Sequence, residues 1–170
     1  MIKKEKEIIL GIDPGTVVTG YGIVAISNNK LTALDFGCIR PKAKKLSLRY
    51  RYIFEGLLEL CDKYLPTAVA VEEQFIHKNV KSALKLGMAK GACIIAASLR
   101  EIPIFSYAPS QAKCALVGNG RASKAQVQAM CKHVLSLHQN PEPEDAADAL
   151  ALAICHINTM RAPNNTHCEI

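Results

Sequence analysis

Four acidic residues of this chain have the side-chain type and the placement that divalent metal chemistry needs. Asp13 lies in the segment GIDPG, Glu72 in VEEQF, and Asp145 and Asp148 in EDAADALALA. Carboxylate oxygens are hard ligands that suit Mg²⁺ or Mn²⁺. Two ions held by shared carboxylates can activate water and stabilise the leaving oxygen of a phosphodiester. If the four side chains converge, the sequence predicts a metal-dependent site that acts on a polyanion.

Each acid also has an explanation that involves no catalysis. The Asp-Pro-Gly segment at Asp13 is a common turn, Glu72 can face solvent where a strand ends, and Asp145 can compensate a helix dipole. Dipole compensation explains Asp148 less well, because this residue lies on the same helix face among alanines that allow close packing. Strand alternation places Glu72 and Glu73 on opposite faces, so only one of them is expected to reach the site.

The elements that position these acids follow from hydrophobic periodicity and turn residues. The first three strands suit an antiparallel meander with a hairpin turn at Asn28 and Asn29, and the later strands alternate with helices, as parallel crossovers do. We therefore expect an α/β fold with a mixed five-stranded sheet flanked by helices on both faces. The expected strands are 7–13, 19–26, 31–39, 67–72 and 102–107, and the expected helices are 47–64, 80–100, 110–117, one capped by Ser123 that runs to 137, and 144–160.

Length and composition narrow the class of protein. A chain of 170 residues fits one compact domain, which we expect to span 1–160, with 161–170 as a disordered tail. A hydrophobic content of 49% excludes disordered and fibrous classes, and a net charge of +6 favours an anionic partner such as nucleic acid. The seven cysteines lack zinc-site spacing, and no signal peptide or membrane span is evident, so we expect free thiols in the cytoplasm.

Basic residues form three groups that together favour a surface tracking a phosphate backbone, although each group alone is typical of a solvated face. Phe75, in an expected loop, would gain about 1–3 kcal/mol by stacking on an unpaired base, or could pack into the core instead. The three groups are Arg40, Lys42, Lys44, Lys45, Arg49 and Arg51; Lys78, Lys81 and Lys85; and Lys113, Arg121 and Lys124.

Three segments, GIDPGTVVTGYG, VEEQFIHKNVKSALKLGMAKG and DAADALALAICH, together resemble the RuvC family of Holliday junction resolvases over nearly the whole chain. The resemblance implies a ribonuclease-H-like fold in which the first and fourth strands are parallel neighbours. It also implies that Asp13, Glu72, Asp145 and Asp148 are the catalytic metal ligands, with two Mg²⁺ ions, or Mn²⁺, in each site. Some relatives have His at the last of these positions.

The same resemblance implies a substrate and partners. It matches Phe75 to an aromatic residue near the crossover point, and Lys113 and Lys124 to two functionally important lysines. It implies a homodimer that nicks two opposed strands of four-way junction DNA symmetrically, in recombination and repair, together with the RuvA–RuvB branch-migration complex. We expect the helix over 80–100 to form the dimer interface.

Three alternatives stay open on the sequence alone. GIDPGT resembles the first phosphate loop of ATP-binding proteins of the actin and sugar-kinase class, but that architecture needs two lobes and a second phosphate loop. A ribonuclease-H-fold nuclease acting on RNA would share the acids, although Lys113, Lys124 and the Phe75 loop favour junction DNA. A junction-binding module without catalysis would not need the full set of carboxylates.

Overall fold

A five-stranded mixed sheet of order β3-β2-β1-β4-β5 forms the centre of the molecule. The computed structural model describes residues 7–73, 79–162, 167 and 169–170. The elements are β1 (Glu7–Asp13), β2 (Thr19–Ser27), β3 (Lys30–Ile39), α1 (Leu46–Tyr64), β4 (Ala68–Glu72), α2 (Val80–Ser98), β5 (Ile104–Tyr107), α3 (Pro109–Val117), α4 (Lys124–Val134) and α5 (Glu144–Arg161).

The strand directions place four strand ends at one edge of the sheet. β1, β2 and β3 form the predicted antiparallel meander, and the turn between β2 and β3 uses Asn28 and Asn29 with φ of 49° and 64°. β4 pairs in parallel with both β1 and β5, which confirms that the first and fourth strands are parallel neighbours. The carboxyl ends of β1, β3, β4 and β5 therefore share one edge.

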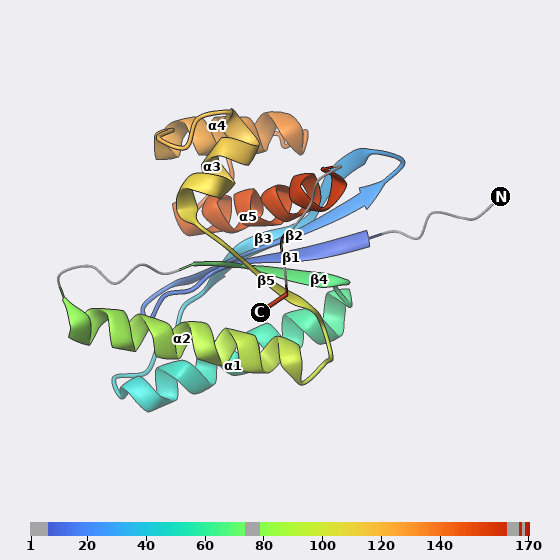
Figure 1. Ribbon diagram of the computed structural model, residues 1–170. Coiled ribbons are helices and arrows are strands. Elements are labelled where there is room, and N and C mark those ends of the chain that lie inside the picture. The colour runs from blue at the N-terminus through green and yellow to red at the C-terminus, as the bar shows by residue number, and fades with distance from the viewer. Residues whose placement is uncertain (1–6, 74–78, 163–166, 168) are drawn as a thin grey trace.

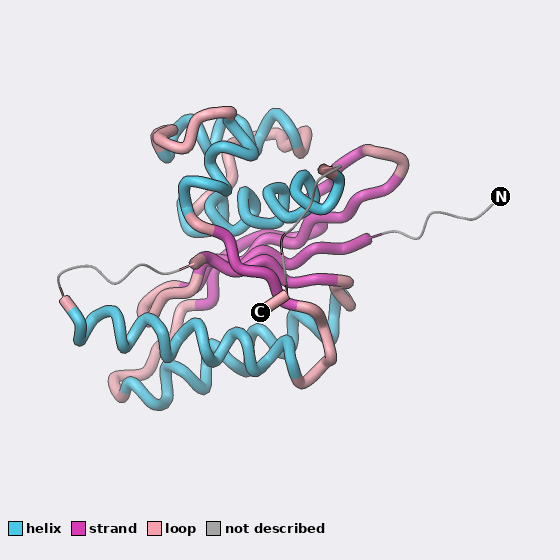
Figure 2. The backbone as a smooth tube through the Cα atoms, viewed as in Figure 1, coloured by secondary structure: helices cyan, strands magenta, loops and turns pink. Residues whose placement is uncertain are grey.

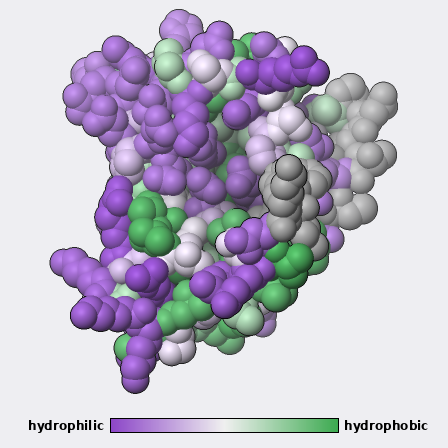
Figure 3. All heavy atoms as spheres, turned by 90° about the vertical axis from the view of Figure 1, so that its left-hand side faces the viewer, coloured by the Kyte–Doolittle hydropathy of each residue, from purple (hydrophilic) through white to green (hydrophobic). Residues whose placement is uncertain are grey.

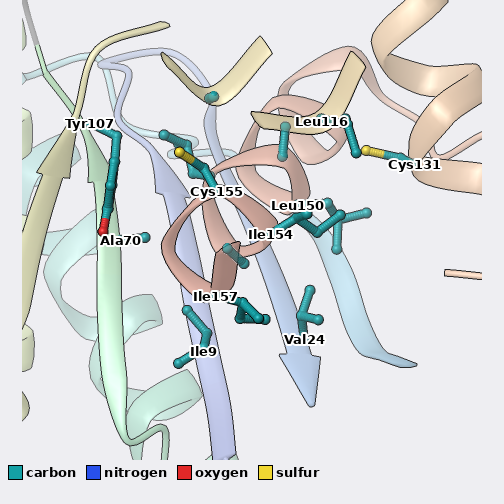
Figure 4. Close-up of a cluster of buried hydrophobic side chains, with 14 of the residues drawn as sticks. Ile9, Val24, Ala70, Tyr107, Leu116, Cys131, Leu150, Ile154, Cys155 and Ile157 are labelled. Carbon is teal, nitrogen blue, oxygen red and sulfur yellow. The ribbon is translucent and has the colours of Figure 1, made fainter. Parts of the chain in front are cut away.

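Helices cover both faces of the sheet, as predicted. α1 and α2 lie on one face, while α5 lies directly on the other, with α3 and α4 outside it (Figures 1 and 2). Strand alternation divides the core, because Leu10 and Ile12 of β1 pack with α1 and α2, whereas Ile9 packs with α5. Figure 4 shows this second cluster, in which Leu150 and Ile154 of α5 lie between the sheet and the outer helices.

Glycines in the sheet and alanines in the helix let α5 lie unusually close to β1 and β2. A Cβ atom at Gly11 would overlap the carbonyl oxygen of Ala149, and one at Gly22 would meet the backbone of Leu150. The α5 residues 146–157 are almost all buried. The close approach fixes the position of this helix, which carries two of the four acids.

Two helices end earlier than their periodicity predicts. α4 ends at Val134, three residues before the predicted end at 137, and α2 ends at Ser98, two residues before the predicted end at 100. Ser136 and Glu101, just beyond these ends, adopt φ of 53° and 54°. This left-handed conformation closes a helix by redirecting the chain, and it usually occurs at glycine.

The cysteines and the helix lengths are two further features of the described residues. The cysteines that the structure describes are all free thiols. No helix in the described part of the chain combines the length and the apolar character that crossing a membrane requires.

Buried His156 makes stability depend on pH. Its side chain is 4% exposed, and Nδ1 lies 2.8 Å from the Tyr107 hydroxyl. Burial, with a smaller contribution from His167, lowers the pKa of His156 to about 4. An unfolded histidine titrates near pH 6.5, so the stability that neutral His156 contributes is lost as pH falls from about 6.5 to 4, by up to about 3 kcal/mol.

We therefore expect the stability advantage of the wild type over His156→Gln to shrink by up to about 3 kcal/mol between pH 7 and pH 4. Urea unfolding of both proteins at each pH measures this difference, and the subtraction removes the titration of other groups. An advantage that stays constant across this range would contradict the assigned pKa.

Candidate active site

Asp13 and Glu72 lie side by side at the carboxyl ends of two neighbouring parallel strands. Ile12 of β1 is in register with Val71 of β4, so the next residue of each strand is adjacent too. Both side chains lie on the sheet face that α5 covers, because they continue the alternation that buries Ile9 and Ala68 there. The Asp13 carboxyl and the Glu72 carboxylate are hydrogen-bonded to each other.

Burial and mutual repulsion control the protonation of this acidic group. Burial, followed by the charges of the other three acids, raises the pKa of Asp13 to about 8. Burial and Asp148 also raise the pKa of Glu72, against the lowering effects of the Asp13 hydrogen bond, Lys113 and Lys124. Burial raises the pKa of Asp148, and the same two lysines oppose that shift. The site thus concentrates negative charge that a cation would stabilise.

The first two turns of α5 bring Asp145 and Asp148 to this strand end. Gly20 of β2 pairs with Asp13 in the sheet, and a Cβ atom there would overlap the carbonyl oxygen of Asp145. The amino end of α5 therefore rests on β2 directly beside Asp13. Asp145 and Asp148 both act on the pKa of Asp13 through their charges, so the structure brings all four predicted acids into one cluster.

A pocket of about 190 Å³ opens beside this cluster. Its polar lining consists of Glu72, Asp148, Lys113 and Lys124. The Lys124 ammonium lies 3.9 Å from an Asp148 carboxylate oxygen and 2.9 Å from one of Glu144. Figure 3 shows this edge of the molecule, and hydrophilic side chains cover much of it. Two acids and two cations thus share one opening, as a site for a phosphate group and its counterions would require.

Three of the other predicted DNA-binding residues lie outside this pocket lining. Lys81 and Lys85 are exposed on α2, on the opposite face of the sheet from α5, and Arg121 is exposed in the segment before α4. Phe75 and Lys78 lie outside the described residues.

Two residues near the site were not predicted from the sequence. Glu144 forms an ion pair with Lys124, and no spacing signal distinguishes it from other acids at a helix start. Lys90 of α2 is half-buried and donates a hydrogen bond of 2.9 Å to the Ser106 hydroxyl. Burial lowers the pKa of Lys90, against the opposing charges of Glu73 and Glu72. The sequence signal available for Lys90 was its position inside an otherwise apolar helical stretch.

The donor atoms of the cluster fit a hard divalent cation, because all of them are carboxylate oxygens. In the described ranges, no three Asp, Glu, His or Cys side chains lie close enough together to hold a metal ion. Asp13 and Glu72 instead hydrogen-bond to each other. A cation bound there would favour the charged form of both acids, whose pKa values burial and neighbouring carboxylates raise.

Comparison with known proteins identifies the family. The family model described as crossover junction endodeoxyribonuclease RuvC matches residues 9–156. The chain belongs to the RuvC family. A crossover junction endodeoxyribonuclease RuvC from Protochlamydia amoebophila is 57% identical over 150 residues, which cover 88% of this chain and 89% of that protein. The resemblance inferred from the three motifs is therefore confirmed, and it favours a nuclease over an ATP-binding protein.

Solved structures agree with this assignment to the RuvC family. Thermus thermophilus RuvC in complex with a Holliday junction substrate matches with a TM-score of 0.88 and 35% identity, over 96% of this chain and 99% of that one. The yeast mitochondrial Holliday junction resolvase Ydc2 matches with a TM-score of 0.64 at 14% identity, over 89% and 79% of the two chains, and shows the fold alone. The ribonuclease-H-like fold is confirmed, and membership of this nuclease family implies dependence on a divalent metal ion.

Proposed function

We propose that the acidic cluster is the catalytic centre with which this RuvC-family crossover junction endodeoxyribonuclease resolves four-way DNA junctions by paired symmetric nicks, in recombination and repair. The observation that carries the proposal is the hydrogen-bonded pair of Asp13 and Glu72 at adjacent strand ends, with Asp145 and Asp148 beside it. The Thermus relative, solved with a Holliday junction substrate, supports the junction as substrate. Cleavage of a synthetic junction in Mg²⁺, described at the end of the Discussion, tests the proposal.

The residues of the cluster have separate tasks in this proposal. The four acids would hold two Mg²⁺ ions, for which Mn²⁺ could substitute. When bound, such ions supply an activated water and stabilise the leaving oxygen. Asp13 would lose its proton to solvent when a cation binds, so that both carboxylates are charged. Lys113 and Lys124, on the pocket wall, bind the phosphate oxygens and stabilise the negative charge that grows during cleavage.

Lys124→Gln is expected to slow single-turnover junction cleavage about a hundredfold, because it removes a cation that stabilises the developing charge. Junction affinity should fall by about tenfold or less, since a single phosphate contact is lost. Lys132→Gln is the matched control, because Lys132 lies on the same helix outside the pocket lining. Equal losses of cleavage in the two variants would contradict the role of Lys124.

The remaining basic residues and one aromatic residue complete the proposed DNA surface. Their charge supports contact with phosphates, and an aromatic ring close after Glu72 supports stacking on an unpaired base. These residues are Phe75, Lys78, Lys81, Lys85 and Arg121.

An apolar face of α2 supports a homodimer. Large exposed apolar patches mark protein interfaces, and a two-fold enzyme on a nearly two-fold substrate gives paired nicks. Cβ atoms at Gly87 and Gly91 would meet no atom within 4 Å, so the helix backbone is open to a close partner there. The exposed fractions are 62% for Val80, 61% for Leu84, 58% for Met88, 55% for Ile95 and 57% for Leu99.

Met88→Glu is expected to convert dimers into monomers, raising the dimer dissociation constant at least about a hundredfold, because a buried unpaired carboxylate opposes association. Sedimentation velocity measures the change, and the monomer should lose paired cleavage. Leu48→Glu is the control, because Leu48 is 45% exposed on α1. A Met88→Glu protein that stays dimeric would exclude α2 as the interface.

We further propose that the protein acts with the RuvA–RuvB complex in the cytoplasm, which the family membership supports.

In this proposal residues 1–160 form a single nuclease domain and 161–170 a tail. Two described tail residues contact β5, because His167 Nε2 lies 2.8 Å from the Ser106 carbonyl oxygen and the Ile170 amide donates to Ile104 at 2.9 Å.

A further inference from the structure

The segment 40–45 between β3 and α1, here called the basic loop, leaves the sheet at the active-site edge. β3 runs in the same direction as β1, because both are antiparallel to β2. Asp13 pairs with Gly20, and Gly20 pairs with Cys38, so the loop starts two residues beyond the strand row that contains Asp13. Four of its side chains are basic and exposed, namely Arg40, Lys42, Lys44 and Lys45.

Neighbouring residues hold the basic loop in place. The Arg49 Nε donates to the carbonyl oxygen of Ala43 at 2.8 Å, and Pro41 restricts the backbone. Arg51 pairs with Glu55 at 2.6 Å on the helix surface. Two of the six cations in this stretch are thus used within the protein. Among the described residues, the four cations of the loop itself have no ion-pair partner.

The acidic cluster lies between the basic loop and the lysines of the pocket. Lys113 and Lys124 come from α3 and α4, and they line the pocket together with Glu72 at the end of β4. The loop follows β3, which lies on the other side of β1, two strands away. Two strand spacings are about 10 Å, and phosphates of one DNA strand recur about every 3.4 Å along the helix axis. The loop therefore starts at least about 10 Å from Asp13, within reach of a phosphate a few nucleotides from one cleaved there.

We propose that the basic loop binds the phosphate backbone of junction DNA on the β3 side of the cluster, opposite Lys113 and Lys124. This inference rests on the proposed nuclease function and adds a second, distant phosphate contact to it. Exposed lysines on a held loop bind phosphates through charge and position the nucleic acid without reading its sequence. Their contribution to binding therefore depends on salt.

The test compares two double variants that remove the same charge. Lys42→Gln with Lys44→Gln alters the basic loop. Lys30→Gln with Arg161→Gln alters the opposite end of the sheet, where Arg161 lies 3.3 Å from the Asn29 side chain. Affinity for a labelled four-way junction is measured without divalent ions over a series of salt concentrations, and matching thermal unfolding shows that both variants are folded.

In the loop variant, the slope of log affinity against log salt should become shallower by about 1–2 units, because each lost phosphate contact removes about one. The control variant should keep the wild-type slope. Equal slope changes in the two variants, or no change in either, would overturn the proposal. If the wild type cleaves normally but the salt slopes of the loop and control variants match, the loop contact alone is refuted. If the wild type does not cleave the junction, the nuclease function itself is refuted.

Discussion

Asp13→Asn is expected to slow Mg²⁺-dependent cleavage of a four-way junction at least about a thousandfold, because metal-held charge stabilisation contributes several kcal/mol. Asparagine keeps the shape of the side chain and one oxygen, but it removes the carboxylate charge at the end of β1. Asp148→Asn should have a similar effect. Junction affinity should persist in both variants, because the proposed DNA contacts are basic residues on the surrounding surface.

Glu73→Gln is the matched control for these acids. Glu73 follows Glu72 directly, but its exposed side chain belongs to the opposite strand face, so cleavage should remain within about threefold of wild type. Single-turnover cleavage and equilibrium binding of the same labelled junction separate chemistry from affinity. Cleavage at the wild-type rate by Asp13→Asn or Asp148→Asn would refute their assignment as metal ligands.

Gly11→Ala is expected to destabilise the protein by about 3 kcal/mol or more, at the upper end of the usual effect of overpacking. The added methyl group would overlap backbone atoms of Ala149 and Ala153 rather than a side chain that can rotate away. The whole of α5 must therefore move, and it carries Asp145 and Asp148. The midpoint of urea unfolding should fall, and the folded fraction should cleave junctions poorly.

Gly56→Ala provides the comparison for this prediction. A methyl group there would approach the end of the Ile39 side chain at 3.0 Å, which can adjust, and alanine favours the α1 helix by up to about 1 kcal/mol. Its stability should therefore stay within about 1 kcal/mol of wild type. Unfolding midpoints that shift equally in the two variants would show that close packing of α5 on the sheet is not decisive.

The sheet and the acidic cluster could be predicted because they depend on local patterns. Apolar runs bounded by turn residues located the strands, and Asp13 and Glu72 each end such a run. That the first and fourth strands are neighbours came from the family resemblance, because periodicity does not specify strand order. Once those strands pair in parallel, the juxtaposition of the two acids follows from geometry.

Other features depend on contacts that no local pattern encodes. Ser136 and Glu101 close their helices in a left-handed conformation without glycine, so the usual signal for a helix end was missing. The raised pKa of Asp13 depends on its burial and on the neighbouring acids, which are properties of the packed molecule. The cations of the basic loop were visible in the sequence, but their position beside the site depends on the direction of β3.

The most direct test of the proposed function maps the cuts that the wild-type protein makes in a synthetic four-way junction with Mg²⁺. Each of the four strands is labelled in turn, and a linear duplex of the same sequence serves as the control substrate. We predict cuts at symmetric positions on two opposed strands, with ends that a ligase can seal, and no comparable cleavage of the duplex. Equal cleavage of the linear duplex, or cuts without two-fold symmetry, would contradict the account.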